Sequence, residues 1–476
     1  MPTAAFATLG CKVNQYETQR ILDDFEARGF GITDFACPAD VYVINTCSVT
    51  QAAERKSRHL VRRIARSNPN AVVVMTGCYG EMARIKGEKV EEAALTVPNT
   101  DKLQTLQHVL RAHPHLEEAL RNAVPPAVSP PRRCRAMIKA QDGCNVFCSF
   151  CSIPFTRHVM QSRTMAEIIQ ESAWRAEQGC KEIVVTGVLV GAYGMEEGFL
   201  ARNGHPADLA DLLLALARTP GIERVRLSSI EPTQVSDKLL AAFRSELRLC
   251  RHLHIPLQSG DNDVLRAMNR PYNREFYLQR CAEAKRQVAD LAITSDILVG
   301  FPGETRQAFE NTIGVVREIG FARAHLFRYS PRPNTPAAEM KHQVPDEEKE
   351  ARSKELAGAC SLAQSRFIAG YIGRRLDVLV EGRDRGAPLP EPETSGNALH
   401  TPINPAASSG SSLLAGYTSN YIRVRFTGSA GLIGSLLSVQ LLEQSGDGAI
   451  GESSGASMEA PPDALFLPNA QLAGRL

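Results

Sequence analysis

The segment DGCNVFCSFC, residues 142–151, carries three cysteines at the spacing C-x3-C-x2-C: Cys144, Cys148 and Cys151. Disulfides use cysteines in pairs, and a structural zinc site usually has four ligands in a closed shell. A 4Fe–4S cluster is held by thiolates, so three cysteines would bind three irons and leave the fourth open to another ligand. No second C-x2-C motif, which would complete a four-cysteine zinc site, lies nearby. The loop therefore favours an iron–sulfur cluster over zinc or a structural cysteine cluster.

Three further cysteines, Cys11, Cys47 and Cys78, each end a short apolar run that is typical of a β-strand. The runs are AAFATLGC, VYVINTC and AVVVMTGC, and segments with helical periodicity separate them. In a parallel α/β sheet the carboxyl ends of the strands converge on one edge, where ligands bind. A single cysteine there would be an ordinary small buried residue. Three in succession favour a shared site.

Bulk properties restrict the class of protein. A length of 476 residues predicts about three domains. The N-terminus lacks the basic start and apolar segment of a secretory signal, and no apolar run approaches the ~20 residues of a membrane span. We expect a cytoplasmic protein with no membrane contact, in which clustered thiols serve metal binding or catalysis rather than disulfides. The net charge of +2 neither supports nor excludes a nucleic-acid partner.

Alternating strand and helix patterns predict an α/β fold for the first two domains. Residues 1–125 should form a domain with a parallel sheet, and the Pro-rich segment around 126–135 should be a linker. Six strand candidates over residues 136–369, most of them separated by helices, predict a partial (β/α)6 barrel. The loops at the carboxyl ends of its strands should carry the chemistry.

The pattern changes after residue 370 to short alternating strands, which predict a small β-barrel of the oligonucleotide-binding kind over 370–442. A flexible insertion at about 384–412 interrupts it, by its composition. Residues 443–476 are rich in Gly, Ser, Ala and Pro, and we expect a disordered tail.

A cysteine loop after the first strand of a six-unit barrel resembles the radical S-adenosylmethionine (SAM) superfamily. The segments TLGCKVNQYE, VINTCSVT and VVMTGCYGE resemble the N-terminal domain of its methylthiotransferases. IKAQDGCNVFCSFCSIPF, HIPLQSGDNDVLRAMNRPY, SDILVGFPGET and YSPRPNTPAA resemble their barrel, and GYTSNYIRVRF resembles their RNA-binding TRAM domain. The resemblance covers about residues 3–442.

The resemblance implies two 4Fe–4S clusters, one at Cys144, Cys148 and Cys151 with SAM on its open iron, and one at Cys11, Cys47 and Cys78. In this family one SAM methylates a sulfur on the second cluster. Another SAM supplies the radical that removes hydrogen from C2 of an adenosine in tRNA. An electron donor such as flavodoxin or ferredoxin and a sulfur source are implied as partners. Radical chemistry is needed because a purine C–H bond has no useful acidity.

The family has three branches, which act on threonylcarbamoyladenosine in tRNA, on isopentenyladenosine in tRNA, or on an aspartate of a ribosomal protein. The motif GCKVNQYET, with Lys12, Val13, Tyr16 and Glu17, resembles the threonylcarbamoyl branch most. The other two substrates remain alternatives. A non-enzymatic iron–sulfur carrier is a further alternative, although a carrier would need neither a barrel of this kind nor a TRAM-like domain.

Residues at the predicted strand ends are candidates for SAM binding by the same resemblance. They are Thr186, Gly187, Glu231, Gln258, Ser259, Gly300, Gly303, Glu304 and Arg332. Turn geometry explains each glycine equally well. Arg332 could bind a carboxylate or the substrate, or it could cap the barrel.

One predicted helix of the first domain is strongly basic. A run of this kind is usually a solvated face, and an RNA-binding patch gains support only from the predicted nucleic-acid-type barrel. Its basic residues are Arg55, Lys56, Arg58, Arg62, Arg63 and Arg66.

Overall fold

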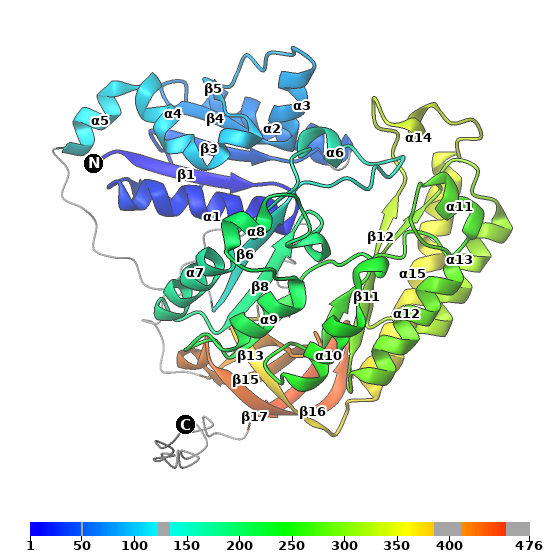
Figure 1. Cartoon of the computed structure of the whole chain (residues 1–476). Coiled ribbons are helices and arrows are strands. Elements are labelled where there is room, and N and C mark those ends of the chain that lie inside the picture. Colours follow the sequence, from blue (N-terminus) through cyan, green and yellow to red (C-terminus); the bar gives the residue numbers. More distant parts are fainter. Residues whose placement is uncertain (49–50, 122–133, 385–410, 454–476) are drawn as a thin grey trace, which may run out of the picture.

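The computed structural model describes residues 1–48, 51–121, 134–384 and 411–453 (Figure 1). An N-terminal α/β domain lies against one end of a central barrel, and a small C-terminal β-barrel lies against the opposite end. The α/β fold class, the partial barrel and the closed β-barrel are those predicted from the sequence. No described helix has both the length and the apolar content needed to cross a membrane.

The N-terminal domain is a parallel sheet in the order β2-β1-β3-β4-β5 with helices on both faces. Its strands are β1 (Thr3–Thr8), β2 (Gly31–Ile32), β3 (Val41–Thr46), β4 (Val72–Gly77) and β5 (Leu95–Thr96). Helices α1 (Lys12–Ala27), α4 (Thr105–Ala112) and α5 (Pro114–Arg121) pack on one face, and α2 (Gln51–Ser67) and α3 (Cys78–Ile85) on the other. Strands β1, β3 and β4 are buried on both faces, so their sequences are continuously apolar.

The central domain consists of two strand groups, β7-β6-β8-β9 and β10-β11-β12. Single bridges from Val225 to Leu249 and from Ser229 to His254 join them into a partial barrel. Six of the strands run parallel, and the short β7 is antiparallel to β6. The strands are β6 (Arg135–Asp142), β7 (Gln161–Ser162), β8 (Glu182–Gly187), β9 (Arg224–Leu227), β10 (His252–His254), β11 (Ala292–Val299) and β12 (Arg323–Arg328).

The helices of the central domain cover the outside of this barrel, where their apolar faces form the largest core. Capping boxes begin two of them, at Thr164 with Glu167 and at Asp208 with Asp211. The helices are α6 (Ile153–Thr156), α7 (Met165–Glu177), α8 (Phe199–Asn203), α9 (Leu209–Ala217), α10 (Asp237–Ser245), α11 (Asn262–Ala267), α12 (Arg274–Gln287), α13 (Arg306–Ile319), α14 (Pro336–Glu339) and α15 (Asp346–Ala369).

The C-terminal domain is a closed barrel in the order β13-β14-β15-β17-β16. Its strands are β13 (Arg375–Arg383), β14 (Ser411–Thr418), β15 (Arg423–Ser429), β16 (Leu436–Ser445) and β17 (Gly448–Ser453). The predicted tail from residue 443 is wrong over 443–453, because β16 continues to Ser445 and β17 closes the barrel. The glycine content of this segment led to the wrong prediction of disorder. Gly451 lies in a strand, where glycine is needed because a Cβ would lie 2.5 Å from the Val439 side chain. Ser411 and Ser412 likewise belong to β14 rather than to the insertion.

Other boundaries fall outside the described residues. These are residues 126–133 of the predicted linker, residues 385–410 of the insertion and residues 454–476 of the predicted tail.

A buried charge cluster fixes the C-terminal barrel to the central domain. Glu182 at the start of β8 accepts a hydrogen bond from Arg226 Nε at 2.7 Å, and Arg226 also donates to the carbonyl oxygen of Ser419 at 3.0 Å. Arg135 pairs with Glu381 on β13. Burial alone would raise the pKa of Glu182, but Arg226 and Arg135 outweigh it and hold the pKa at about 2.

We predict that Glu182→Gln lowers the free energy of unfolding by about 3–5 kcal/mol, since it leaves buried arginines without their carboxylate. The pKa of Glu182 is lower in the folded chain than in the unfolded chain. The ionised Glu182 therefore makes its full contribution to the free energy of unfolding at any pH above the ordinary glutamate pKa of about 4.3. This contribution disappears only as the pH falls toward 2. Urea unfolding of wild type and variant should give the same difference at pH 7 and pH 5. A difference that halves at pH 5 would show that Glu182 titrates much higher.

Candidate active site

The three strand-end cysteines lie at the carboxyl edge of the N-terminal sheet, as predicted. Cys11 directly precedes α1, Cys47 follows β3, and Cys78 begins α3 immediately after β4. Glycines with positive φ bring these turns together. A Cβ at Gly10 would lie 2.6 Å from the sulfur of Cys47, and one at Gly77 would lie 2.3 Å from a carbonyl oxygen at the end of β3. Only glycine fits at either position.

The loop after β6 presents its three cysteines with a hydrogen-bond donor at each sulfur. Backbone N–H groups two residues further along donate to Cys144 and Cys151, at N···S distances of 3.5 and 3.4 Å. Arg270 donates to the sulfur of Cys148 at 3.0 Å. Donors of this kind favour the thiolate form and tune the potential of an iron–sulfur cluster. The three residues therefore fit the ligand set of such a cluster.

The thiols of this loop, of which Cys148 is buried and Cys144 and Cys151 are half-buried, need a positive charge nearby to ionise readily. Burial, together with the nearby thiol of Cys148, raises the pKa of Cys151 to about 12. Iron that binds these sulfurs as thiolates would displace their protons and supply that charge.

Arg157 connects the two groups of cysteines. Its guanidinium donates to Glu17 on α1 at 2.8 and 2.9 Å, to Asn14 at 3.1 Å, and to Asp142 at the end of β6 at 2.9 Å. Its carbonyl oxygen accepts from the N–H of Cys144 at 3.2 Å. One residue thus holds both the helix that begins beside the first group and the loop that carries the second.

Glu17 is the buried acceptor at the centre of this contact. Lys102 and Lys139 donate to it at 2.7 and 2.9 Å, in addition to Arg157. Burial alone would raise the pKa of Glu17, but the three cations hold it well below its ordinary value. Burial raises the pKa of Cys11, and the positive charge of Arg157 opposes that rise.

Arg332 lies near a cysteine of each group, since Cys47 and Cys151 both act on its charge. Burial lowers its pKa, while Glu54, Cys47 and Cys151 oppose that change. Its side chain is buried, and no described residue hydrogen-bonds its Nη1, with the Glu54 carboxylate 3.7 Å away. A buried guanidinium nitrogen without such a bond calls for an explanation, and an anionic ligand between the cysteine groups would supply one.

Among the predicted SAM contacts, Glu231 is tied to the cysteine loop. Its carboxylate pairs with Arg270, which also binds the sulfur of Cys148. Thr186 and Gly187 end β8, in the strand next to β6, and the hydroxyls of Thr186 and Ser228 lie 3.2 Å apart.

The remaining predicted contacts lie at the ends of β10 and β11. Gln258 and Ser259 follow β10, and Gly300, Gly303 and Glu304 follow β11. Glu304 accepts from the N–H of Gly300 at 3.1 Å and pairs with Arg352 on α15 at 2.5 Å. Its carboxylate therefore stabilises this turn, which is a structural role. Gly300 and Gly303 have positive φ, in agreement with the turn interpretation.

Sequence analysis did not identify Arg157 or Arg270 as site residues. Glu17 is 140 positions from Arg157, and Cys148 is 122 positions from Arg270, so no local spacing relates them. The available signal was indirect, because Arg270 lies within one of the segments that resemble the family.

Comparison with known families agrees with this geometry. A model of the radical SAM superfamily matches residues 138–316, and a model described as uncharacterized protein family UPF0004 matches residues 3–97. The central domain, with its cysteine loop after the first barrel strand, is thus that of a radical SAM enzyme.

Relatives cover nearly the whole chain. The threonylcarbamoyladenosine tRNA methylthiotransferase MtaB of Bacillus subtilis is 35% identical over 93% of this chain and 94% of its own length. The protein of the same name from Thermotoga maritima is 34% identical, over 80% and 87%. The tRNA-2-methylthio-N(6)-dimethylallyladenosine synthase of Akkermansia muciniphila is 32% identical, over 80% and 88%. Among solved structures, the radical SAM methyltransferase TsrM of Kitasatospora setae is 15% identical, over 71% of this chain and 75% of its own, with a TM-score of 0.49.

The chain belongs to the radical SAM methylthiotransferase family. It is therefore an enzyme, and its cofactors are SAM and two 4Fe–4S clusters. The structure offers two groups of three cysteines, Cys11, Cys47 and Cys78 and Cys144, Cys148 and Cys151.

We predict that Arg157→Gln lowers the free energy of unfolding by about 3–5 kcal/mol, because it removes the buried partner of Glu17 and Asp142. Urea unfolding of the full chain measures the loss, and iron content after reconstitution should fall with it. Arg28→Gln is the matched control. It removes an arginine–glutamate pair, Arg28 with Glu117, from the surface of the N-terminal domain, and we expect a loss below about 1 kcal/mol. Equal losses in the two variants would contradict the role assigned to Arg157.

Proposed function

We propose that this enzyme transfers a methylthio group to C2 of N6-threonylcarbamoyladenosine in tRNA. The observation that carries the proposal is the juxtaposition of two groups of three cysteines, joined by Arg157 and with Arg332 near a cysteine of each. The most extensive of the relatives described above, at 35% identity over 94% of its length, is named for this reaction.

In this proposal Cys144, Cys148 and Cys151 hold the cluster that binds SAM, and Cys11, Cys47 and Cys78 hold the auxiliary cluster. When bound, SAM and a reduced cluster supply a radical that can remove hydrogen from an unactivated C–H bond. The protein's own groups position the reactants: Arg270 holds the Cys148 sulfur and the Glu231 carboxylate, and Arg157 fixes the spacing of the two cysteine groups.

Contacts to SAM are assigned to the ends of the barrel strands. The buried Nη1 of Arg332 supports its assignment to a carboxylate of SAM or to an anionic group of the substrate. The full set is Thr186, Gly187, Glu231, Gln258, Ser259, Gly300, Gly303, Glu304 and Arg332. Within it, the Glu304 carboxylate contributes through the shape of its turn.

The tRNA partner is supported by an exposed basic face on α2, formed by Arg55, Lys56, Arg58, Arg62, Arg63 and Arg66. Such a face binds phosphates with an affinity that falls as salt is added. The reaction also needs an electron donor, such as flavodoxin or ferredoxin, and a sulfur source. We place it in the cytoplasm with its tRNA.

Isopentenyladenosine is the second candidate substrate, because the Akkermansia muciniphila relative named for dimethylallyladenosine is 32% identical. Mass spectrometry of nucleosides separates the two. We predict that expression in a host without methylthiotransferases produces the 2-methylthio form of threonylcarbamoyladenosine in total tRNA. A change in isopentenyladenosine instead would keep the chemistry and overturn the substrate. No change in either, with both clusters loaded, would direct attention to the ribosomal proteins.

The two clusters can be separated by mutation. We predict that Cys144→Ala abolishes cleavage of SAM to 5′-deoxyadenosine, since the loop then holds only two cluster ligands. Cys47→Ala should leave part of that cleavage but stop methylthio transfer, because only the auxiliary group is damaged. Chromatography of 5′-deoxyadenosine and of the modified nucleoside measures both steps. Full methylthiolation by the Cys47 variant would contradict the two-cluster assignment. A complete absence of SAM cleavage by the wild-type protein would argue for an iron–sulfur carrier.

A further inference from the structure

The cysteine loop after β6 is held by a segment that lies more than a hundred positions further along the chain. Ser149 donates through its backbone N–H to the carbonyl oxygen of Met268 at 3.0 Å and through its hydroxyl to that of Ala267 at 2.8 Å. The side-chain amide of Asn269 donates to the carbonyl oxygen of Phe147 at 2.9 Å. Both Phe147 and Asn269 have positive φ, which is uncommon for residues other than glycine. The end of α11 and the residues after it therefore fix the shape of this loop.

Arg270 follows in this segment, and its side chain is held in one position. Its backbone N–H donates to the carbonyl oxygen of Leu265 at 2.9 Å, and its Nε donates to the hydroxyl of Tyr272 at 3.2 Å. That hydroxyl donates in turn to the carbonyl oxygen of Pro256 at 3.0 Å. Only 3% of the Arg270 side chain is exposed. The position of its guanidinium is thus set by the fold itself.

The two terminal nitrogens of Arg270 bind acceptors from two different loops of the barrel. Nη1 donates to the sulfur of Cys148 in the loop after β6, at 3.0 Å, and Nη2 pairs with the carboxylate of Glu231 in the turn after β9. The donors to the sulfurs of Cys144 and Cys151 are neutral backbone N–H groups at 3.5 and 3.4 Å. Among the described contacts of these three sulfurs, the one at Cys148 is therefore the shortest and the one that brings a full positive charge.

The charges of Arg270 and Glu231 act on the loop in opposite directions. Burial raises the pKa of all three thiols, and the charge of Arg270 opposes that rise at each of them. The charge of Glu231 adds to the rise at Cys144 and Cys148. The guanidinium thus stabilises negative charge on the sulfurs, and the carboxylate reduces that effect.

Reduction of an iron–sulfur cluster adds negative charge, which its thiolate ligands share. Net charge, hydrogen bonds to the sulfurs and exposure to solvent set the potential at which this occurs. A charged donor also acts more strongly in a buried site, where the effective dielectric constant is low. Arg270 is charged, buried and bound to a sulfur, so it meets each of these conditions.

We propose that Arg270 sets the reduction potential of the cluster bound by the cysteine loop, and that Glu231 limits this effect. The proposal rests on the assignment of Cys144, Cys148 and Cys151 to the SAM-binding cluster in the proposed function. In the step concerned, the cluster gains one electron from a one-electron donor such as flavodoxin or ferredoxin. Arg270 keeps its proton throughout, and it acts as a positioning residue that stabilises the added charge through the Cys148 sulfur.

The test is a dye-mediated redox titration of the full chain with both clusters loaded, followed by electron paramagnetic resonance. Each cluster gives one component, and the component that changes when SAM is added to wild type belongs to the cysteine loop. We expect Arg270→Gln to make reduction of this component about tenfold less favourable, which lowers its midpoint potential by about 59 mV for one electron. Glu231→Gln should raise the same midpoint, because Arg270 then acts without its counter-charge. Arg270→Lys keeps the charge, so its midpoint should lie closer to wild type than that of Arg270→Gln.

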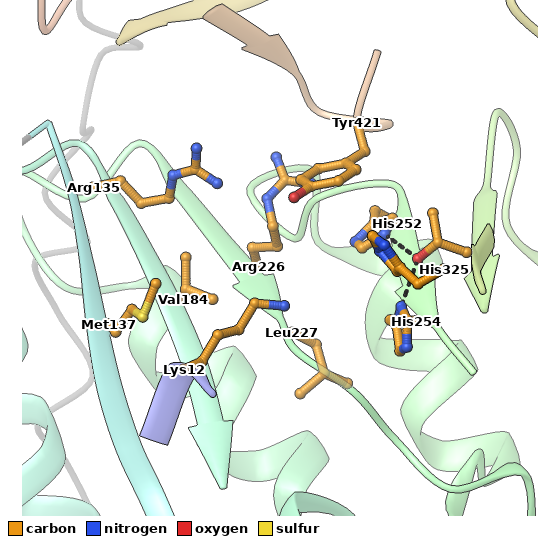
Figure 2. Close-up of a pocket in the computed structure, with 11 residues that line it drawn as sticks. Lys12, Arg135, Met137, Val184, Arg226, Leu227, His252, His254, His325 and Tyr421 are labelled. Carbon is orange, nitrogen blue, oxygen red and sulfur yellow. Dashed lines mark hydrogen bonds between the residues drawn. The ribbon is translucent and has the colours of Figure 1, made fainter. Parts of the chain in front are cut away.

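Arg226→Gln is the matched control, since it also breaks a deeply buried arginine–glutamate pair, Arg226 with Glu182. Arg226 lies beside Tyr421 of the C-terminal barrel, away from the cysteines, so both midpoints should stay unchanged (Figure 2). Shifts of the same sign in Arg270→Gln and Glu231→Gln would overturn the proposal, because loss of the ion pair would then explain both. An unchanged midpoint in either variant would also overturn it.

If Arg270→Gln does not retain its iron, Glu231→Gln decides alone, since its midpoint must still rise above that of wild type. A wild-type protein in which no component responds to SAM would overturn the assignment of the loop and this proposal with it. The midpoints are measured without substrate, so a failure of the proposed substrate is a separate result, seen as absence of the 2-methylthio nucleoside from tRNA.

Discussion

Two groups of cysteines that belong to different domains can act on one substrate only if the domains are held in a fixed relation. The buried carboxylate of Glu17 provides that relation, since it accepts from Arg157 and Lys139 of the central domain and from Lys102 of its own. Through the carbonyl oxygen of Arg157 the same contact reaches Cys144. A shift at this point would change the distance between the two cysteine groups.

The charges of this contact do not cancel among themselves. Three cations, Arg157, Lys102 and Lys139, face two carboxylates, Glu17 and Asp142. The excess positive charge lies beside Cys11, and buried charge is costly unless it is compensated. Thiolate ligands of a bound cluster supply negative charge at this place. Cluster loading and domain docking should therefore stabilise each other.

Local patterns were sufficient for the cysteines and for most of the strands. Cys11, Cys47 and Cys78 could be grouped because strand ends of a parallel sheet meet, and the loop of Cys144 is defined by its spacing. Arg157 and Arg270 could not be found in this way, since Glu17 and Cys148, which they bind, lie more than a hundred positions away. Composition failed at β17, where glycine is required by crowding inside the barrel rather than by flexibility. The assignment of Glu304 also needed the structure, because only the fold shows its contact with Arg352.

The placement of the C-terminal barrel limits how RNA can reach the site. Arg224 donates to the carbonyl oxygen of Tyr417 near the end of β14, and Arg226 donates to that of Ser419 in the β14–β15 turn. Tyr421 from that turn stacks on His252 at the start of β10. This turn is therefore packed against the central domain. The C-terminal barrel covers the amino ends of the barrel strands, so in the proposed function the substrate base would enter at their carboxyl ends. Helix α2 borders that entrance, as Gln51 donates to the carbonyl oxygen of Pro331 next to Arg332. In the proposed function, the basic face of α2 would thus lie beside the nucleotide segment whose base reaches the cysteine groups.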